Sequence, residues 1–180
     1  MLLVVDNGSI YTASLLSFLS EKRLQFTTLS FDKIILSNLQ QYSSIILSGR
    51  RKNNPLMNSI NSKIVKHAVL EKKPLLGICY GAEILALTLG GTLKKLNQIH
   101  KGNQEIEILK TNPLCNGTIN VFESHSYLIS ALDKHFTQIA KSNVCNFEII
   151  QYDNLNIFGT QFHPEMSDDG KLLLERFLSI

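Results

Sequence analysis

The sequence predicts a single α/β domain spanning residues 1–180, with a mostly parallel central sheet, helices on both faces and added antiparallel strands. Over residues 1–90, short β-branched runs alternate with helical patterns, which indicates parallel strands joined by crossover helices. Over residues 104–162, short and often alternating segments follow one another, which is typical of antiparallel strands. The length of 180 residues suits one domain with a substantial core.

The first half of the chain divides into strands and helices by local pattern. Residues 2–5 are an apolar run that ends at "DNGS", so a buried strand followed by a turn is expected. Ser9 is expected to cap a helix with apolar residues at helical spacing: Tyr11, Leu15, Leu16, Phe18 and Leu19. Further strands are expected at residues 24–30, 43–49 and 74–78, and further helices near residues 60–69 and 82–89.

The second half is expected to add antiparallel strands and one helix. The strands are expected at residues 104–110, 118–124, 136–142, 146–152 and 156–162. A final helix near residues 170–178 is expected to bury Leu172, Leu173, Phe177 and Leu178. Residues 50–55 and 96–104 have the composition of mobile loops.

Composition narrows the class of protein. The net charge is +3 and the basic residues occur in scattered short pairs, which disfavours a nucleic-acid partner. The three cysteines are Cys79, Cys115 and Cys145, without CxxC spacing, so neither a disulfide framework nor a zinc site is expected. The N-terminus lacks the pattern of a signal peptide, and no apolar run approaches the ~18 residues of a membrane span. A cytoplasmic protein without a membrane partner is expected.

Cys79 lies in "GICYG", where a predicted strand gives way to a predicted helix. This G-x-nucleophile-x-G pattern is typical of a sharp strand-to-helix turn that exposes a nucleophile. A helix N-terminus favours the thiolate and can lower a cysteine pKa from ~8.5 into the range of ~3.5–7.5. A buried structural cysteine is the alternative, and it is the interpretation we favour for Cys115 and Cys145.

A base and its orienting group are expected in "QFHPE", after the last predicted strand. Pro164 disfavours the helical conformation for His163. In an extended segment residues i and i+2 point to the same side, so Glu165 can hold the imidazole while its other nitrogen accepts the thiol proton.

The segments "GICYGAE" and "GTQFHPE", with "VVDNGS", "IILSG" and "ESHS" in the same order, resemble class I (triad-type) glutamine amidotransferases. "DNG", "CYG" and "LGG" are most similar to the stand-alone glutaminase subunit of archaeal GMP synthases. The resemblance covers essentially the whole chain and implies a flavodoxin-like three-layer sandwich.

The resemblance implies that Cys79 attacks L-glutamine, His163 moves the proton and Glu165 orients the imidazole. Tyr80 and Arg50, the residue after Gly49, would donate backbone N–H groups to the oxyanion. Glutamine would also meet Glu83 and the backbone of Ser124, His125 and Ser126. No metal or cofactor is expected for this step; an ATP-pyrophosphatase synthetase subunit, using ATP and Mg, would receive the ammonia and convert XMP to GMP.

Four departures from the family pattern keep alternatives open. The usual glycine and glutamine are replaced by Arg50 and Glu83, an aspartate is replaced by Tyr127, and "PEMSDDGK" lacks a common His-Thr pair. The alternatives are a glutaminase component of anthranilate or aminodeoxychorismate synthase, a catalytically silent regulatory subunit, and a hydrolase of another γ-glutamyl amide.

Overall fold

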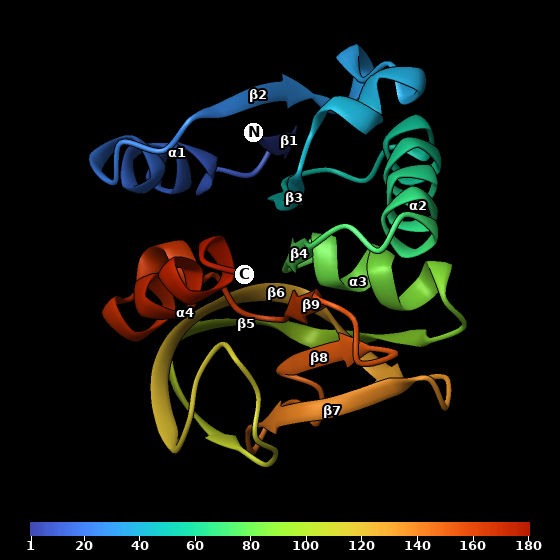
Figure 1. Ribbon diagram of the computed structural model, residues 1–180. Coiled ribbons are helices and arrows are strands. Elements are labelled where there is room, and N and C mark those ends of the chain that lie inside the picture. Colours follow the sequence, from blue (N-terminus) through green and yellow to red (C-terminus); the bar gives the residue numbers. More distant parts are fainter.

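Nine strands form one continuous sheet in the computed structural model, which describes residues 1–180 (Figure 1). They are β1 (Leu2–Asn7), β2 (Phe26–Ser30), β3 (Ser44–Arg50), β4 (Leu75–Ile78), β5 (Thr92–Ile108), β6 (Thr118–Ala131), β7 (Phe136–Lys141), β8 (Ile149–Tyr152) and β9 (Ile157–Thr160). The order across the sheet is β2-β1-β3-β4-β9-β8-β7-β5-β6. The first five of these are parallel, and the remaining pairs are antiparallel.

Four helices cover the parallel part of the sheet (Figure 1). They are α1 (Thr12–Glu21), α2 (Pro55–Leu70), α3 (Tyr80–Thr88) and α4 (Asp168–Leu178), with short 3-10 turns at Phe31–Lys33, Leu36–Gln41 and Pro164–Met166. Leu2 and Val4 pack with side chains of α1 and α4, whereas Leu3 and Val5 pack with those of α2 and α3. A strand covered on both faces needs apolar residues at every position, which explains the continuous run in β1.

The predicted α/β class, with a mostly parallel sheet and added antiparallel strands, is confirmed. The direction expected for one strand is wrong: β9 is parallel to β4 and lies in the middle of the sheet. Residues 96–104, expected to be a loop, lie inside β5, because pairing with β6 outweighs their polar composition.

Two helix details also differ from expectation. Helix α1 starts at Thr12, and Ser9 accepts a hydrogen bond from the Tyr11 N–H instead of capping the helix. In α4 the inward side chains are Leu173, Leu174 and Phe177, whereas Leu172 is 51% exposed. Residues 170, 173, 174 and 177 recur at helical spacing and share the buried face, which leaves Leu172 outside it.

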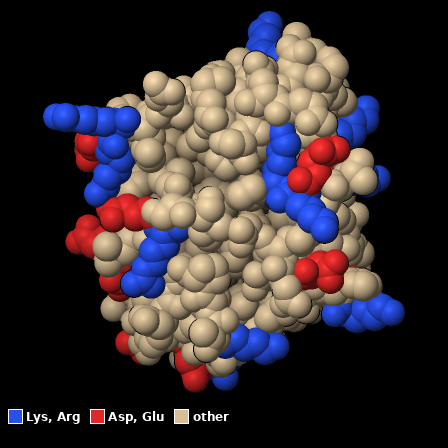
Figure 2. Space-filling model, in the orientation of Figure 1, with Lys and Arg blue, Asp and Glu red and all other residues tan.

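On the face in Figure 2, Lys and Arg side chains lie singly or in small groups, with Asp and Glu side chains beside several of them. This face therefore has no broad basic region of the kind that tracks a nucleic-acid backbone. None of the helices combines the length and the apolar character that a bilayer crossing requires.

Candidate active site

Cys79 lies at the sharp turn between β4 and α3, at the carboxyl end of the parallel strands. Its backbone has φ of +52°, a strained value for a residue other than glycine. Its N–H donates to the Thr160 carbonyl at 2.7 Å, which fixes the corner to β9. The flanking glycines allow the turn: a Cβ at Gly77 would lie 2.4 Å from backbone atoms of Gly81. The predicted strand-to-helix corner is confirmed.

The corner opens into a cavity of about 570 Å³. Seven residues expected at the site line it: Arg50, Cys79, Tyr80, Glu83, Ser124, His125 and Ser126. Tyr127, at the end of the segment expected to line the glutamine site, also lines the cavity, as do Asn53 and Asn58, which were not predicted as site residues. Cys79 itself is 7% exposed. The sequence therefore brings residues from β3, α3 and β6 together around one thiol.

His163 and Glu165 lie beside this cavity but do not line it, and both are buried. His163 is extended, as predicted, and its Nδ1 lies 2.8 Å from Oε1 of Glu165. Because the carboxylate accepts, Nδ1 carries the hydrogen and Nε2 is left able to take a proton. The imidazole packs 4.4 Å from the Tyr11 ring, and a Cβ at Gly49 would lie 3.0 Å from its Cε1.

The surroundings of the Cys79 thiol favour its neutral form. Its Sγ donates a long hydrogen bond of 3.9 Å to the carbonyl oxygen of Ser124, and it has no hydrogen bond to His163. Burial raises the pKa of the thiol well above its ordinary value, and the charges of Glu83, Glu123 and Glu165 raise it further. The Tyr80 N–H opposes this shift. Burial and the neighbouring acidic side chains thus outweigh the lowering that a helix N-terminus can produce, and Glu83 acts in the direction expected of a carboxylate beside the thiol.

Arg50 and Glu83, two departures from the family pattern, contact each other. The Arg50 Nη2 lies 3.3 Å from Oε2 of Glu83, and its guanidinium lies 4.4 Å from the centre of the Tyr80 ring. Burial raises the pKa of Glu83, and the Arg50 charge opposes the rise. The two substitutions thus compensate each other, since a buried carboxylate is costly without a partner.

The Arg50 backbone is less free than a loop residue would be. Arg50 ends β3, pairs with Asn7 of β1 and forms an isolated bridge with Gly8. Its predicted role as an oxyanion donor therefore concerns a residue that belongs to the sheet.

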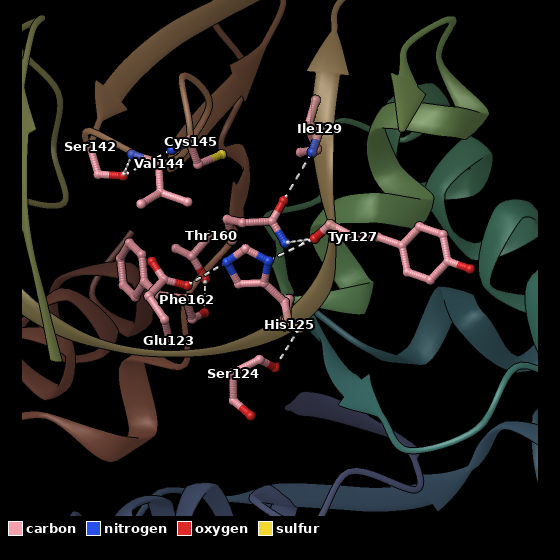
Figure 3. Close-up of polar contacts among 12 residues, drawn as sticks. Glu123, Ser124, His125, Tyr127, Ile129, Ser142, Val144, Cys145, Thr160 and Phe162 are labelled. Atoms are coloured by element: carbon pink, nitrogen blue, oxygen red, sulfur yellow. Dashed lines mark hydrogen bonds and ion pairs between the residues drawn. The ribbon is translucent and has the colours of Figure 1, made fainter. Parts of the chain in front are cut away.

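The segment from Ser124 to Tyr127 forms the opposite wall, and its buried supports were not predicted (Figure 3). The Tyr127 carbonyl accepts from Nδ1 of His125 at 2.8 Å and from Nε2 of Gln161 at 3.3 Å. Nε2 of His125 lies 3.0 Å from Oε2 of Glu123. A carboxylate at an inward position of a predicted strand was the signal that could have revealed this cluster.

The other two cysteines and the possible metal ligands were also considered in the sequence. Cys115 and Cys145 are buried away from the cavity lining, and burial raises the pKa of both thiols, that of Cys115 to about 11. No group of three or more His, Cys, Asp or Glu side chains is arranged to hold a metal ion.

A family model for "Glutamine amidotransferase class-I" matches residues 3–179. A glutamine-hydrolyzing GMP synthase subunit of Pyrococcus furiosus is 30% identical over 190 residues, covering all of this chain and 98% of that protein. GMP synthase [glutamine-hydrolyzing] of Yersinia enterocolitica is 28% identical over 98% of this chain. This chain spans 36% of the Yersinia protein and 30% of a similar Leptospira interrogans protein, about a third of such relatives.

Solved structures show the same arrangement. A crystal structure from Thermoplasma acidophilum, provisionally described as that of a GMP synthase subunit, superposes with a TM-score of 0.88 at 27% identity. The superposition covers 99% of this chain and 92% of the other. The curled sheet of parallel and antiparallel strands is thus shared along the whole chain.

Proposed function

The chain belongs to the class I glutamine amidotransferases, and from this membership we propose that it is a glutaminase subunit that hydrolyses L-glutamine to glutamate and ammonia. One observation carries the proposal. A cysteine on a strained strand-to-helix corner opens into a cavity, while a 2.8 Å histidine–glutamate contact follows the neighbouring strand β9. Nucleophile, base and orienting carboxylate are the parts that thioester chemistry needs.

In the proposed reaction Cys79 Sγ attacks the side-chain amide carbon of glutamine. Nε2 of His163 takes the thiol proton and returns it to the leaving nitrogen, so that ammonia departs and a thioester remains. Glu165 stabilises the imidazolium through Nδ1–H. Water, deprotonated by the same imidazole, then releases glutamate and restores the thiol. The Tyr80 N–H, which already favours the thiolate, donates to the oxyanion.

The second oxyanion donor is proposed to be the N–H of Arg50. Since Arg50 is paired with β1, the proposal includes a shift at the end of β3 when substrate or a partner binds. The same event must move Sγ from the Ser124 carbonyl toward His163. A low basal rate that rises with a partner is therefore expected.

We propose that the ammonia passes to an ATP-pyrophosphatase synthetase subunit that uses ATP and Mg, with XMP converted to GMP. The full-length similarity to a stand-alone GMP synthase subunit supports this acceptor. The larger Yersinia and Leptospira relatives, of which the chain spans about a third, support a partner that supplies the remaining part. No cofactor is proposed for the glutaminase step itself.

The test is glutamate release by the purified chain, alone and with candidate synthetase subunits, ATP, Mg and XMP. With the correct synthetase, we expect release to increase and GMP to form in equal amount, with Cys79→Ser as the inactive control. Synthetases that use chorismate belong in the same assay, because turnover with those alone would move the acceptor to the anthranilate or aminodeoxychorismate type. A folded chain without glutamate release in any pairing would overturn the proposal.

A catalytically silent regulatory subunit is the second candidate. The burial of the Cys79 thiol, which raises its pKa, and the Arg50–Glu83 pair in the cavity favour it. A diazo-ketone analogue of glutamine separates the two candidates. A mass increase on Cys79 contradicts the silent candidate, whereas no labelling in the presence of the synthetase supports it. Faster turnover of γ-glutamyl amides than of glutamine would instead indicate another substrate.

A further inference from the structure

Strand β6 carries ionisable side chains at positions where its pattern calls for apolar ones. Its inward residues Ile119 and Val121 are buried in the core. The next two inward positions hold Glu123 and His125, which are 0% and 4% exposed. Glu148, just before β8, is also 0% exposed. Burying an ionised group without a hydrogen-bond partner costs free energy. The question for this cluster is therefore which of its groups carry protons.

The contacts of His125 fix one of its nitrogens (Figure 3). Nδ1 lies 2.8 Å from the carbonyl oxygen of Tyr127. Since a carbonyl oxygen only accepts, Nδ1 carries a hydrogen and donates it. Nε2 lies 3.0 Å from Oε2 of Glu123. Neither atom has a hydrogen bond of good geometry, but a ring nitrogen and a carboxyl oxygen this close repel each other unless one of them carries a proton.

Glu148 adds a second buried carboxyl group, close enough to Glu123 for the charge of Glu123 to raise its pKa. None of the four carboxyl oxygens accepts a hydrogen bond of normal geometry from a backbone N–H or a hydroxyl group. No Lys or Arg forms an ion pair with either residue. Two neighbouring buried carboxyl groups repel each other when both are ionised and no cation is near, so one of them is expected to keep a proton.

The pKa shifts agree with this geometry. Burial raises the pKa of Glu123 to about 7, and burial with the neighbouring Glu123 raises that of Glu148 well above its ordinary value. Burial lowers the pKa of His125. The other titratable groups that face the three residues are Cys79, Glu83, His100, Cys145 and His163. None of these is a Lys or Arg, so no permanent positive charge compensates two carboxylates.

The cluster is connected to the cavity through its wall. The Tyr127 carbonyl is held from one side by His125 and from the other by Gln161, whose Oε1 accepts from the Ile129 N–H at 3.1 Å. Three residues earlier, the carbonyl of Ser124 faces Sγ of Cys79 at 3.9 Å. The orientation of the His125 ring therefore sets the position of the backbone against which the thiol rests.

We propose that Glu148, Glu123 and His125 form a buried proton-sharing array that is electrically neutral and holds the 124–127 wall in place. One proton lies between the two carboxyl groups, one lies between Glu123 and Nε2 of His125, and Nδ1–H remains on Tyr127. The three are positioning residues, since none is assigned a contact with the reacting atoms. Their effect on turnover rests on the proposed glutaminase function; the proton distribution does not.

The proton distribution is measured on the wild-type protein by NMR, with ¹⁵N-labelled histidine and ¹³C-labelled glutamate carboxyl groups. We expect His125 to be protonated on Nδ1 throughout, and two carboxyl signals to titrate above pH 6. A His125 ring protonated on Nε2 alone would overturn the proposal. Two carboxyl groups that ionise together below pH 5 would also overturn it. This measurement requires no turnover, so it decides the array even if the chain hydrolyses no glutamine.

Variants of Glu123 test the effect on the wall. In Glu123→Gln the amide N–H can donate to Nε2 of His125 while its oxygen accepts from Glu148, so KM for glutamine should stay within about threefold of wild type. In Glu123→Ala the imidazole loses its partner, and KM should rise about tenfold or more. Glu105→Gln, an exposed change on β5, is the matched control.

An equal rise in KM in Glu123→Gln and Glu123→Ala, with both variants folded by circular dichroism, would contradict the array. In that case a neutral N–H donor at position 123 would have failed to replace the shared proton. If Glu123→Ala does not fold, the His125 tautomer in wild type and in Glu123→Gln still decides the question. Absence of turnover in wild type would count against the proposed function and leave the NMR result to stand alone.

Discussion

The ion pair of Arg50 and Glu83 in the cavity should contribute a measurable interaction free energy to stability. The proposed perturbation is a double-mutant cycle of Arg50→Ala, Glu83→Gln and both changes together. Arg50→Ala leaves a 5% exposed carboxylate side chain without its cation. Glu83→Gln leaves a guanidinium that is 18% exposed and still stacks on Tyr80. The first single change should therefore cost more stability than the second, and the double change should cost less than their sum.

The structure sets the size of the effect. Two unit charges 3.3 Å apart attract by about 5 kcal/mol at an effective dielectric constant of ~20. The contact is not a hydrogen bond of good geometry, because Oε2 of Glu83 has no hydrogen-bond partner, and desolvation offsets part of the attraction. A coupling free energy of about 1–3 kcal/mol is expected.

Urea denaturation of the four proteins at pH 7 measures this coupling. The pair Lys141–Glu107 is a matched control, because its charges are 3.4 Å apart but its side chains are 45% and 62% exposed. Its coupling should be at most ~0.5 kcal/mol. A value for Arg50–Glu83 no larger than the control value would refute the compensation argument. In the same proteins, alkylation of Cys79 should become faster in Glu83→Gln, since one negative charge near the thiol is removed.

Three further predictions concern single groups. The pKa of Glu123 is about 7 in the folded protein against an ordinary value of 4.5, so its contribution to stability is full below pH 4.5 and is lost as the pH rises through 7. Urea unfolding measures this as a fall in the free energy of unfolding between pH 4.5 and 8. In Glu123→Gln that fall should be smaller by about 3 kcal/mol than in wild type, and an unchanged pH profile would contradict this. Cys79→Ser should abolish the glutamyl adduct seen by intact mass while changing the unfolding free energy by less than about 1 kcal/mol; a persisting adduct would indicate another nucleophile. Glu165→Gln should lower kcat about 10²-fold, because an amide does not stabilise the imidazolium, and undiminished glutamate release would exclude that role.

Local pattern predicts most elements because each depends on neighbours along the chain. The buried run of β1 and the glycine-flanked corner at Cys79 are examples, as their burial and turn geometry are encoded within a few residues. The contact between His163 and Glu165 was also accessible, because an extended i to i+2 spacing fixes which side chains share a face.

The order of strands and the charge balance of the site could not be predicted in this way. Nothing in the composition of residues 157–160 distinguishes a central parallel strand from an added antiparallel one. Glu83, four residues after Cys79, could be recognised from the sequence as a group that raises the thiol pKa, whereas Glu123 and Glu165 could not, because they lie far from Cys79 in sequence. Arg50 and Glu83 look like separate departures in the sequence because their contact exists only in three dimensions.

The central position of β9 has a consequence for synthesis of the chain. Of the nine strands this one is synthesised last, yet it lies between β4 and β8. Until it arrives, a nascent chain has an unpaired apolar edge at β4, a surface that chaperones bind and that promotes aggregation. The Thr160 carbonyl that anchors the Cys79 N–H also arrives with it. The corner that carries Cys79 is therefore completed only when β9 has paired with β4.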